Sequence, residues 1–232
     1  MKRTLFGFTA AALLATGSAS ADTLLNETFD STAGFTTSSA PYTDGAFDYY
    51  GISDGDDLGT GEKAYTGFTG TYLTGMDLDS EGAPPLFTAT WIVDITNYEN
   101  LTFSGLFAEF FDSPGDIDDL DDISVTVQID GGTIQTIIDF DGADYSSSSL
   151  PFNGIFRLDG TGTALGDAAQ LFSAPIAGTG STLTLVLNTD LDSGDEDFGV
   201  DNFVVEGDLV PEPTSLALLG LGGLLVARRR RG

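Results

Sequence analysis

The chain has 232 residues, enough for one domain of ordinary size, and 41% of them are hydrophobic. It holds 36 acidic residues against 8 basic ones, and six of the basic residues lie at the two ends of the chain. This charge excludes ordinary nucleic-acid binding, which needs lysine and arginine to displace counterions from phosphates. The absence of His and Cys excludes His-dependent triads, Cys nucleophiles, His-ligated zinc and disulfides.

The N-terminus has the pattern of a secretory signal peptide. Two basic residues precede an apolar stretch, residues 5–15, and the small residues Ala19 and Ala21 follow it with the spacing that signal peptidase cleaves. The apolar stretch is too short to span a bilayer of about 30 Å. We therefore predict that signal peptidase removes residues 1–21 and that the mature chain begins at Asp22. An uncleaved membrane anchor is the alternative.

Residues 22–208 show no convincing helical periodicity, and short runs rich in Val, Ile, Thr, Phe and Tyr alternate with turn residues. This pattern predicts strands, in chain order, at Leu24–Phe29, Ala46–Tyr50, Tyr65–Leu73, Phe87–Ile95, Leu101–Phe110, Ile123–Ile129, Thr133–Phe140, Gly154–Leu158, Gln170–Ser173, residues 182–188 and Phe198–Glu206. One helical turn is expected near Thr163–Gln170. Many short strands joined by polar turns favour an all-β fold, an antiparallel β-sandwich or jelly roll, over a parallel α/β sheet.

The clearest strand is Ile123–Ile129, in which every second residue is apolar. Side chains of a strand alternate between its two faces, so this segment buries one face and exposes the other. Asp130 and Gly131 follow and favour a tight turn with positive φ angles. We therefore predict a hairpin in which Thr133–Phe140 returns beside the first strand.

The two ends of this domain resemble the first and last strands of jelly-roll carbohydrate-binding-like domains. The resemblance lies in Leu25–Phe29 and in Phe198–Val205. It implies that the two segments lie side by side in one sheet. In that arrangement Glu27 and Asp201 are candidates to share one structural calcium ion.

Four segments concentrate carboxylates, at Asp54–Asp57, Asp77–Glu81, Asp112–Asp122 and Asp190–Asp197. Calcium suits such segments because it is a hard ion that takes 6–8 oxygen ligands. Asp77, Asp79 and Glu81 follow the start of an EF-hand-type loop, but Thr88 stands where that loop needs its glutamate. We therefore reject an EF-hand and keep two interpretations, a calcium-binding acidic turn or a solvated turn. The last two clusters are interpreted as solvated loops between strands.

Neither catalysis nor sugar binding has a decisive signature. Glycosidases need two carboxylates across a sugar site, and Glu109, between phenylalanines, is the most suggestive single acid. We expect it instead on the wet face of a strand edge. Aromatic platforms for a sugar are available at Tyr49, Tyr50, Tyr65, Tyr72 and Tyr98. Trp91 lies in an almost continuous apolar run and is expected in the core.

The C-terminus combines three features in a fixed order. A Pro-Glu-Pro triplet is followed by an apolar run and then by four arginines, and the residues that define the two polar parts are Pro211, Glu212, Pro213, Arg228, Arg229, Arg230 and Arg231. Residues 214–227 would form a helix of about 21 Å, shorter than the usual span of about 20 residues. The arginines favour retention on the cytoplasmic side. We predict a short transmembrane helix with the folded domain outside.

This order resembles the PEP-CTERM sorting domain, over residues 209–232. The resemblance implies a Gram-negative-type bacterium that makes extracellular polysaccharide, and processing by a membrane-embedded exosortase. It also implies an inner-membrane-anchored precursor that is then transferred to the cell surface or released. A plain C-terminal membrane anchor is the alternative.

Together these features predict an exported bacterial cell-surface or extracellular-matrix protein. Its acidic β-domain is expected to be non-enzymatic and to have a structural, adhesive or polysaccharide-associated role, with calcium as the one expected cofactor. The alternative is a secreted carboxylate-dependent hydrolase acting on polysaccharide. A nucleic-acid partner is not expected.

Overall fold

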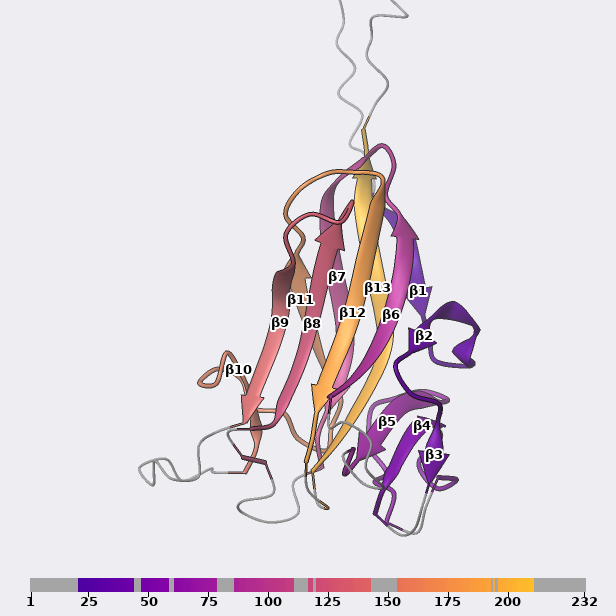
Figure 1. The fold of residues 1–232 in the computed structure, drawn as a ribbon, viewed down its shortest axis with the longest axis vertical. Helices are drawn as coiled ribbons and strands as arrows, with labels where there is room; N and C mark the ends of the chain where they lie inside the picture. The colour runs from indigo at the N-terminus through magenta and orange to yellow at the C-terminus, as the bar shows by residue number, and fades with distance from the viewer. Residues whose placement is uncertain are drawn as a thin grey trace, which may run out of the picture.

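The computed structural model describes residues 21–43, 47–58, 61–78, 86–110, 117–118, 120–142, 154–192, 194 and 196–210. The predictions for the signal peptide, Ala21 excepted, and for the sorting tail from Pro211 to Arg231 lie outside these residues. Within them, no helix is long and apolar enough to cross a membrane. The described chain is all-β, and its strands form two antiparallel sheets (Figure 1).

The first sheet has seven strands, in the order β11-β7-β13-β5-β4-β3, with β1 also paired to β13. Its strands are β1 (Asp22–Glu27), β3 (Tyr42–Thr43), β4 (Tyr49–Ser53), β5 (Tyr72–Met76), β7 (Tyr98–Ala108), β11 (Gln170–Pro175) and β13 (Asp197–Leu209). The second sheet has six strands, in the order β10-β9-β8-β12-β6-β2. Its strands are β2 (Thr36–Thr37), β6 (Leu86–Asp94), β8 (Asp122–Ile129), β9 (Gln135–Gly142), β10 (Phe156–Leu158) and β12 (Thr182–Asp190). A 3-10 turn, η1 (Thr32–Gly34), joins β1 to β2.

The sandwich core follows from the alternating pattern of the long strands. In β12 every second side chain is buried, and the strand pairs along its whole length with β6 and from Leu183 to Asp190 with β8. Phe203 of β13 lies at the centre of an aromatic cluster, with its ring centroid 5.4 Å from that of Phe29 and 5.5 Å from that of Trp91. Such close, tilted or edge-on contacts stabilise a core beyond the area that they bury. The core position predicted for Trp91 is confirmed.

The predicted hairpin is confirmed. Strand β8 pairs with β9, and the turn between them places Asp130 at φ +48° and Gly131 at φ +70°. Positive φ at both central residues matches the right-handed twist of the flanking strands. The residues of the turn are therefore sufficient to predict this hairpin, without reference to long-range contacts.

Other local expectations were wrong. The strand predicted at Tyr65–Leu73 begins only at Tyr72, because Gly67 and Gly70 adopt φ angles of +93° and +84° and interrupt the extended chain. The helical turn predicted near Thr163–Gln170 is absent, and Ala164 forms a β-bridge with Arg157 instead. The two-residue strands β2 and β3 were not predicted.

The short strands β4 and β5 are buried on both faces, unlike the rest of the sandwich. All five residues of β5 are buried. A second apolar cluster covers the outer face there, formed by Tyr65, Tyr72 and Ala108 with Phe68 packed against them. The rule that every second side chain of a strand is exposed therefore fails for β4 and β5.

Both ends of the domain lie at one end of the sandwich, here named the terminal pole and defined by Asp22 and Val210. Strands β1 and β13 are antiparallel neighbours with Asp22 opposite Gly207, which confirms the predicted adjacency of the terminal strands (Figure 1). The Tyr98 hydroxyl donates a hydrogen bond to Asp22 Oδ2 (3.2 Å), and the Val210 N–H donates to the carbonyl of Asn97 (2.8 Å). These contacts fix both ends of the domain, at Asp22 and Val210, beside the β6–β7 turn.

The opposite end of the sandwich is here named the loop pole. It is defined by Asp122, Asp190 and Asp197, where β8 begins, β12 ends and β13 begins. Asp122 lies directly opposite Asp190 in the ladder of the second sheet. The pairing therefore brings together two acidic segments that are far apart in the chain.

Candidate functional site

Glu27 lies inside the sandwich and connects its two sheets. Its Oε1 accepts a hydrogen bond from the Phe29 N–H (2.9 Å), and its Oε2 accepts one from Trp91 Nε1 of β6 (3.1 Å). A Cβ on Gly34 would lie 2.3 Å from Glu27 Oε2, so the side chain has no room for a larger neighbour there. Each oxygen of this carboxylate thus has its own N–H donor, which offsets the cost of burying it.

Asp201 is the first residue of a bulge in β13, which extends from Asp201 to Val204. Asn202 adopts φ +53° there, and it donates from its backbone N–H to Asp201 Oδ1 (2.7 Å) and from Nδ2 to Asp201 Oδ2 (3.1 Å). Burial raises the pKa of Asp201 to about 6, and the negative charges of Asp30 and Glu27 add to the effect, against the hydrogen bond from Asn202. Glu27 and Asp201 are therefore near enough to interact electrostatically, and their sharing of a calcium ion stays a prediction.

The EF-hand-like segment begins at the loop pole. Asp77 follows β5 directly with φ +48°, and its N–H donates to the carbonyl of Glu196 (3.3 Å). Asp79 and Glu81 lie outside the described residues, so the predicted calcium-binding turn of these three acids stays a prediction.

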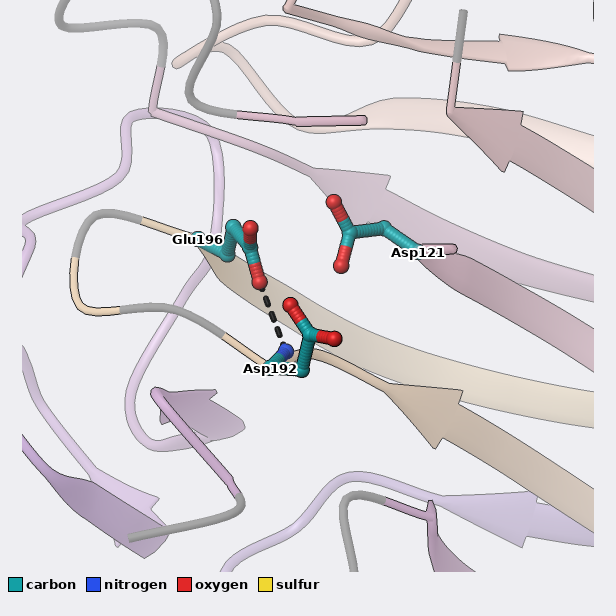
Figure 2. A group of neighbouring side chains, drawn as sticks. All are labelled: Asp121, Asp192 and Glu196. Atoms are coloured by element: carbon teal, nitrogen blue, oxygen red, sulfur yellow. Dashed lines mark hydrogen bonds between the residues drawn. The ribbon is translucent and has the colours of Figure 1, made fainter. Parts of the chain in front are cut away.

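Figure 2 shows three carboxylates that converge at the loop pole, here named the loop-pole carboxylates: Asp121, Asp192 and Glu196. Asp121 directly precedes β8, Asp192 follows β12, and Glu196 directly precedes β13. One carboxylate oxygen of each residue lies within 4.8 Å of the corresponding oxygens of the other two. The geometry could hold a metal ion.

Asp121 lies in the acidic segment Asp112–Asp122, and Asp192 and Glu196 lie in the segment Asp190–Asp197. Both segments were interpreted as solvated loops, and this interpretation is wrong for Asp121 and Glu196. The side chains of Asp121 and Glu196 are only 3% and 2% exposed, whereas Asp192 is exposed. The pairing of β8 with β12, and the return of the chain into β13, bury acids that a local sequence pattern places in solvent. Only knowledge of that strand pairing would have joined the two clusters.

Hydrogen bonds fix two of the loop-pole carboxylates. The Asp118 N–H donates to Asp121 Oδ2 (2.6 Å), and the Asp192 N–H donates to Glu196 Oε2 (2.7 Å; Figure 2). Burial raises the pKa of Asp121 to about 9, and the negative charges of Glu196 and Asp118 add to this, against the hydrogen bond from Asp118. The site thus has a strongly unfavourable electrostatic environment for anionic Asp121.

A second group of three carboxylates lies beside it, formed by Asp122, Asp139 and Asp141. Burial raises the pKa of Asp122 to about 7, with the charge of Asp139 adding to the effect. Arg157 of β10 stands directly opposite Asp141 in the ladder. This group therefore has a basic residue in the neighbouring strand that can offset its charge.

The candidates for catalysis and sugar stacking occupy other positions than expected. Glu109 does not lie on a wet face, because it is 1% exposed and its Oε2 accepts a hydrogen bond from the Phe156 N–H (2.7 Å). It therefore anchors the start of β10. Four of the five tyrosines considered as sugar platforms are buried, namely Tyr49, Tyr50, Tyr65 and Tyr72. Burial on both faces of β4 and β5 removes Tyr49, Tyr50 and Tyr72 from the surface, and Tyr65 belongs to the apolar cluster that covers them.

A shallow depression of about 340 Å³ lies on the outer face of the seven-stranded sheet. It is lined by Thr102, Phe103, Ser104, Ser173, Ala174, Pro175 and Glu206. Its single aromatic residue, Phe103, has its side chain fully buried in the core. It contains one carboxylate, whereas glycoside hydrolysis needs two. This depression therefore has neither a stacking platform nor a catalytic pair.

Comparison with known proteins identifies the tail. Residues 209–231 match the PEP-CTERM protein-sorting motif, which confirms the resemblance seen in the sequence. The motif begins at Leu209, the last residue of β13. It implies an exported, membrane-anchored precursor and processing by an exosortase. No curated protein matches the sequence of the chain.

Several solved structures are similar to the domain in outline. The CBM22-1 xylan-binding domain of Paenibacillus barcinonensis Xyn10C is 13% identical, with 83% of this chain and 98% of that chain covered and a TM-score of 0.43. TmCBM61, solved in complex with β-1,4-galactotriose, is 8% identical over 79% of this chain and 97% of its own, with a TM-score of 0.44. The K3 cleaved adhesin domain of Lys-gingipain from Porphyromonas gingivalis is 12% identical over 79% and 98%, with a TM-score of 0.42.

Proposed function

We propose that this chain is an exported protein of the bacterial cell surface or extracellular matrix, whose acidic β-sandwich is non-enzymatic and has a structural, adhesive or polysaccharide-associated role. The observation that carries the proposal is the sorting motif at residues 209–231, which begins where the last strand of the domain ends. We infer that the motif directs the domain that precedes it to the outside.

The position of the two ends of the domain supports an outward orientation. Asp22 and Val210 both lie at the terminal pole, so an anchor that follows Val210 holds this pole toward the membrane. The loop pole, with its buried and exposed carboxylates, then faces outward. An acidic surface keeps the exported protein dispersed, and divalent cations can bridge it to anionic polymer.

Calcium is the cation that we propose for this role. Glu27 with Asp201, and Asp77 with Asp79 and Glu81, are the candidate ligands taken from the sequence. Thermal unfolding of the protein with calcium and with chelator tests whether these residues bind the ion, since an ion bound to the folded state alone raises the midpoint of unfolding. An unchanged midpoint at millimolar calcium would remove structural calcium from the proposal.

Export and processing are tested in an exopolysaccharide-producing bacterium that encodes an exosortase, compared with an isogenic strain that lacks the enzyme. We expect a mature form that begins at Asp22, lacks the arginine cluster and lies on the surface or in the medium. Replacing Pro211, Glu212 and Pro213 by alanine should leave a longer form in the inner membrane. Glu206→Gln, an exposed acid of β13 outside the motif proper, is the matched control and should be processed normally. Intact chain in the cytosol would contradict the proposal.

The hydrolase alternative draws no support from the described residues. Glu109 is buried behind the start of β10 and bonded to its backbone, and the depression on the outer face contains one acid. A polysaccharide-degradation screen separates the two functions. Binding to polysaccharide without release of shorter sugars is expected, and release of sugars by the wild-type protein would favour the hydrolase.

A further inference from the structure

The loop-pole carboxylates bring together strand ends from both sheets. Asp121 precedes β8 and Asp192 follows β12, both in the six-stranded sheet, whereas Glu196 precedes β13 in the seven-stranded sheet. The protein contains no cysteine that could link the sheets covalently. A ligand held by all three side chains would therefore connect the sheets at this end of the sandwich.

The spacing of the carboxylates fits a calcium ion. Calcium binds oxygen at about 2.3–2.6 Å, so two oxygens of one coordination sphere lie up to about 5 Å apart. Magnesium binds at about 2.0–2.1 Å, which limits the same separation to about 4.2 Å. One oxygen from each of the three residues lies within 4.8 Å of the others. This spacing admits calcium, and calcium is the more suitable ion because magnesium demands near-ideal octahedral geometry and gives up its waters reluctantly.

A buried oxygen that lacks a hydrogen-bond donor points independently to a ligand. Asp121 is 97% buried, and while its Oδ2 accepts a hydrogen bond from the Asp118 N–H, its Oδ1 has no hydrogen-bond partner. The carboxylate faces those of Asp192 and Glu196 (Figure 2). Burying a carboxylate oxygen without a donor or a cation is costly, and a bound cation removes that cost.

We propose that Asp121, Asp192 and Glu196 bind one calcium ion, which ties the two sheets together at the loop pole. Asp192 is exposed, so water reaches the site from its side and completes the coordination. The exposed side also provides the path by which the ion enters. The proposal concerns the fold of this domain and does not depend on where the protein is located.

Thermal unfolding of the purified full-length protein, in calcium and in chelator, tests the site. At a calcium concentration about 100 times the dissociation constant, the midpoint of the wild-type protein should rise by about 5–10 °C. Magnesium at the same concentration should raise it less. Asp121→Asn and Glu196→Gln should each abolish most of the calcium-dependent rise, while their midpoints in chelator stay at or above the wild-type value. Glu99→Gln removes one exposed acid at the terminal pole and should keep the full rise.

Asp192→Asn keeps the test decisive if either buried variant fails to fold, because the Asp192 side chain is exposed and its loss leaves the core unchanged. Equilibrium dialysis with radioactive calcium should then show one bound ion fewer than in the wild-type protein.

Two results would overturn the proposal. One is a wild-type midpoint that does not respond to 5 mM calcium, which is the outcome expected if a proton shared by Asp121 and Glu196 stabilises the pair. The other is a calcium response and stoichiometry that persist in Asp192→Asn but disappear in Asp201→Asn. That result would place the bound ion beside Glu27, and it leaves the proposed export unaffected, since the location is tested by processing of the tail.

Discussion

Glu27 in the middle of the sandwich and Asp121 at the loop pole are both buried carboxylates, but their surroundings differ. Glu27 has an N–H donor for each oxygen, one from its own strand connection and one from Trp91 of the opposite sheet. Asp121 has one donor, one oxygen without a partner, and the negative charge of Glu196 nearby. Each oxygen of Glu27 thus accepts a hydrogen bond from within the protein, whereas Asp121 requires a proton or a cation. Burial alone therefore does not point to a bound ion, whereas a buried carboxylate oxygen without a donor calls for a proton or a cation.

The largest expected loss in the free energy of unfolding comes at high pH, where buried tyrosines rather than buried carboxylates are the acids that titrate. Burial raises the pKa of Tyr49, Tyr50 and Tyr65 well above the ordinary value of 10. Above pH 10 the unfolded chain loses these protons and the folded chain keeps them, so the unfolded state is favoured. The free energy of unfolding should fall by about 1.4 kcal/mol per pH unit for each buried tyrosine. Urea unfolding between pH 8 and 11 measures this slope.

Tyr50→Phe is the control for this titration, because it removes one buried ionisable group and keeps the ring. The dependence of the free energy of unfolding on pH should become weaker by the contribution of one proton, about 1.4 kcal/mol per pH unit. Reversible ionisation of all tyrosines near pH 10 in the folded protein, followed by absorbance at 295 nm, would show that the interior does not exclude charge.

Phe203→Ala should have the next largest effect, because it removes the ring at the centre of the aromatic cluster that includes Phe29, Trp91 and Phe103. We expect a loss of about 3–5 kcal/mol in the free energy of unfolding. Leu171→Ala is the matched control, since that side chain is 68% exposed on β11, and it should change stability by less than about 0.5 kcal/mol. Equal effects of the two substitutions would contradict the assigned core.

Glu27→Gln tests the contribution of the two hydrogen bonds that the Glu27 carboxylate accepts. An amide offers one oxygen, so either the Phe29 N–H or Trp91 Nε1 then faces an NH₂ group and loses its acceptor. The expected loss is about 1–3 kcal/mol, measured by urea unfolding in chelator. The exposed Glu99→Gln carries the same change of charge and should be close to neutral. A neutral Glu27→Gln would mean that these hydrogen bonds are not needed by the core.

Asp121→Asn should have the smallest effect and the opposite sign. In chelator the raised pKa means that the folded protein holds Asp121 as the neutral acid near pH 7, and asparagine is neutral without taking up a proton, so the free energy of unfolding should stay equal or rise, by about 1 kcal/mol. A loss as large as that of Glu27→Gln would show that the Asp121 charge is already compensated within the protein. The comparison between the two buried carboxylates would then fail.

Local patterns in the sequence were sufficient for some elements. The β8–β9 hairpin depends on Asp130 and Gly131, whose positive φ angles are a property of the turn itself. Trp91 was assigned to the core because it lies in an almost continuous apolar run. The terminal strands were correctly placed side by side from their resemblance to jelly-roll domains.

Other features could not be read from local patterns. Tyr49 and Tyr50 are adjacent in the chain, so the two-residue rule places one of them on the surface, but the cluster around Tyr65 covers the outer face of this region. Glu109 was expected in water for a similar reason, and the neighbouring β10 buries it. In each case a segment distant in sequence supplies the cover.

The sequence by itself determined that the chain carries a PEP-CTERM sorting motif, that its body is an antiparallel β-domain, and that it is strongly acidic, because linear motifs, residue periodicity and charge are written in consecutive residues. Only the tertiary structure decided which acids are buried and which of them meet. Asp121 and Glu196 become neighbours because β8 pairs with β12 and the chain then crosses to the other sheet, and such long-range pairing leaves no trace in the spacing of the residues themselves.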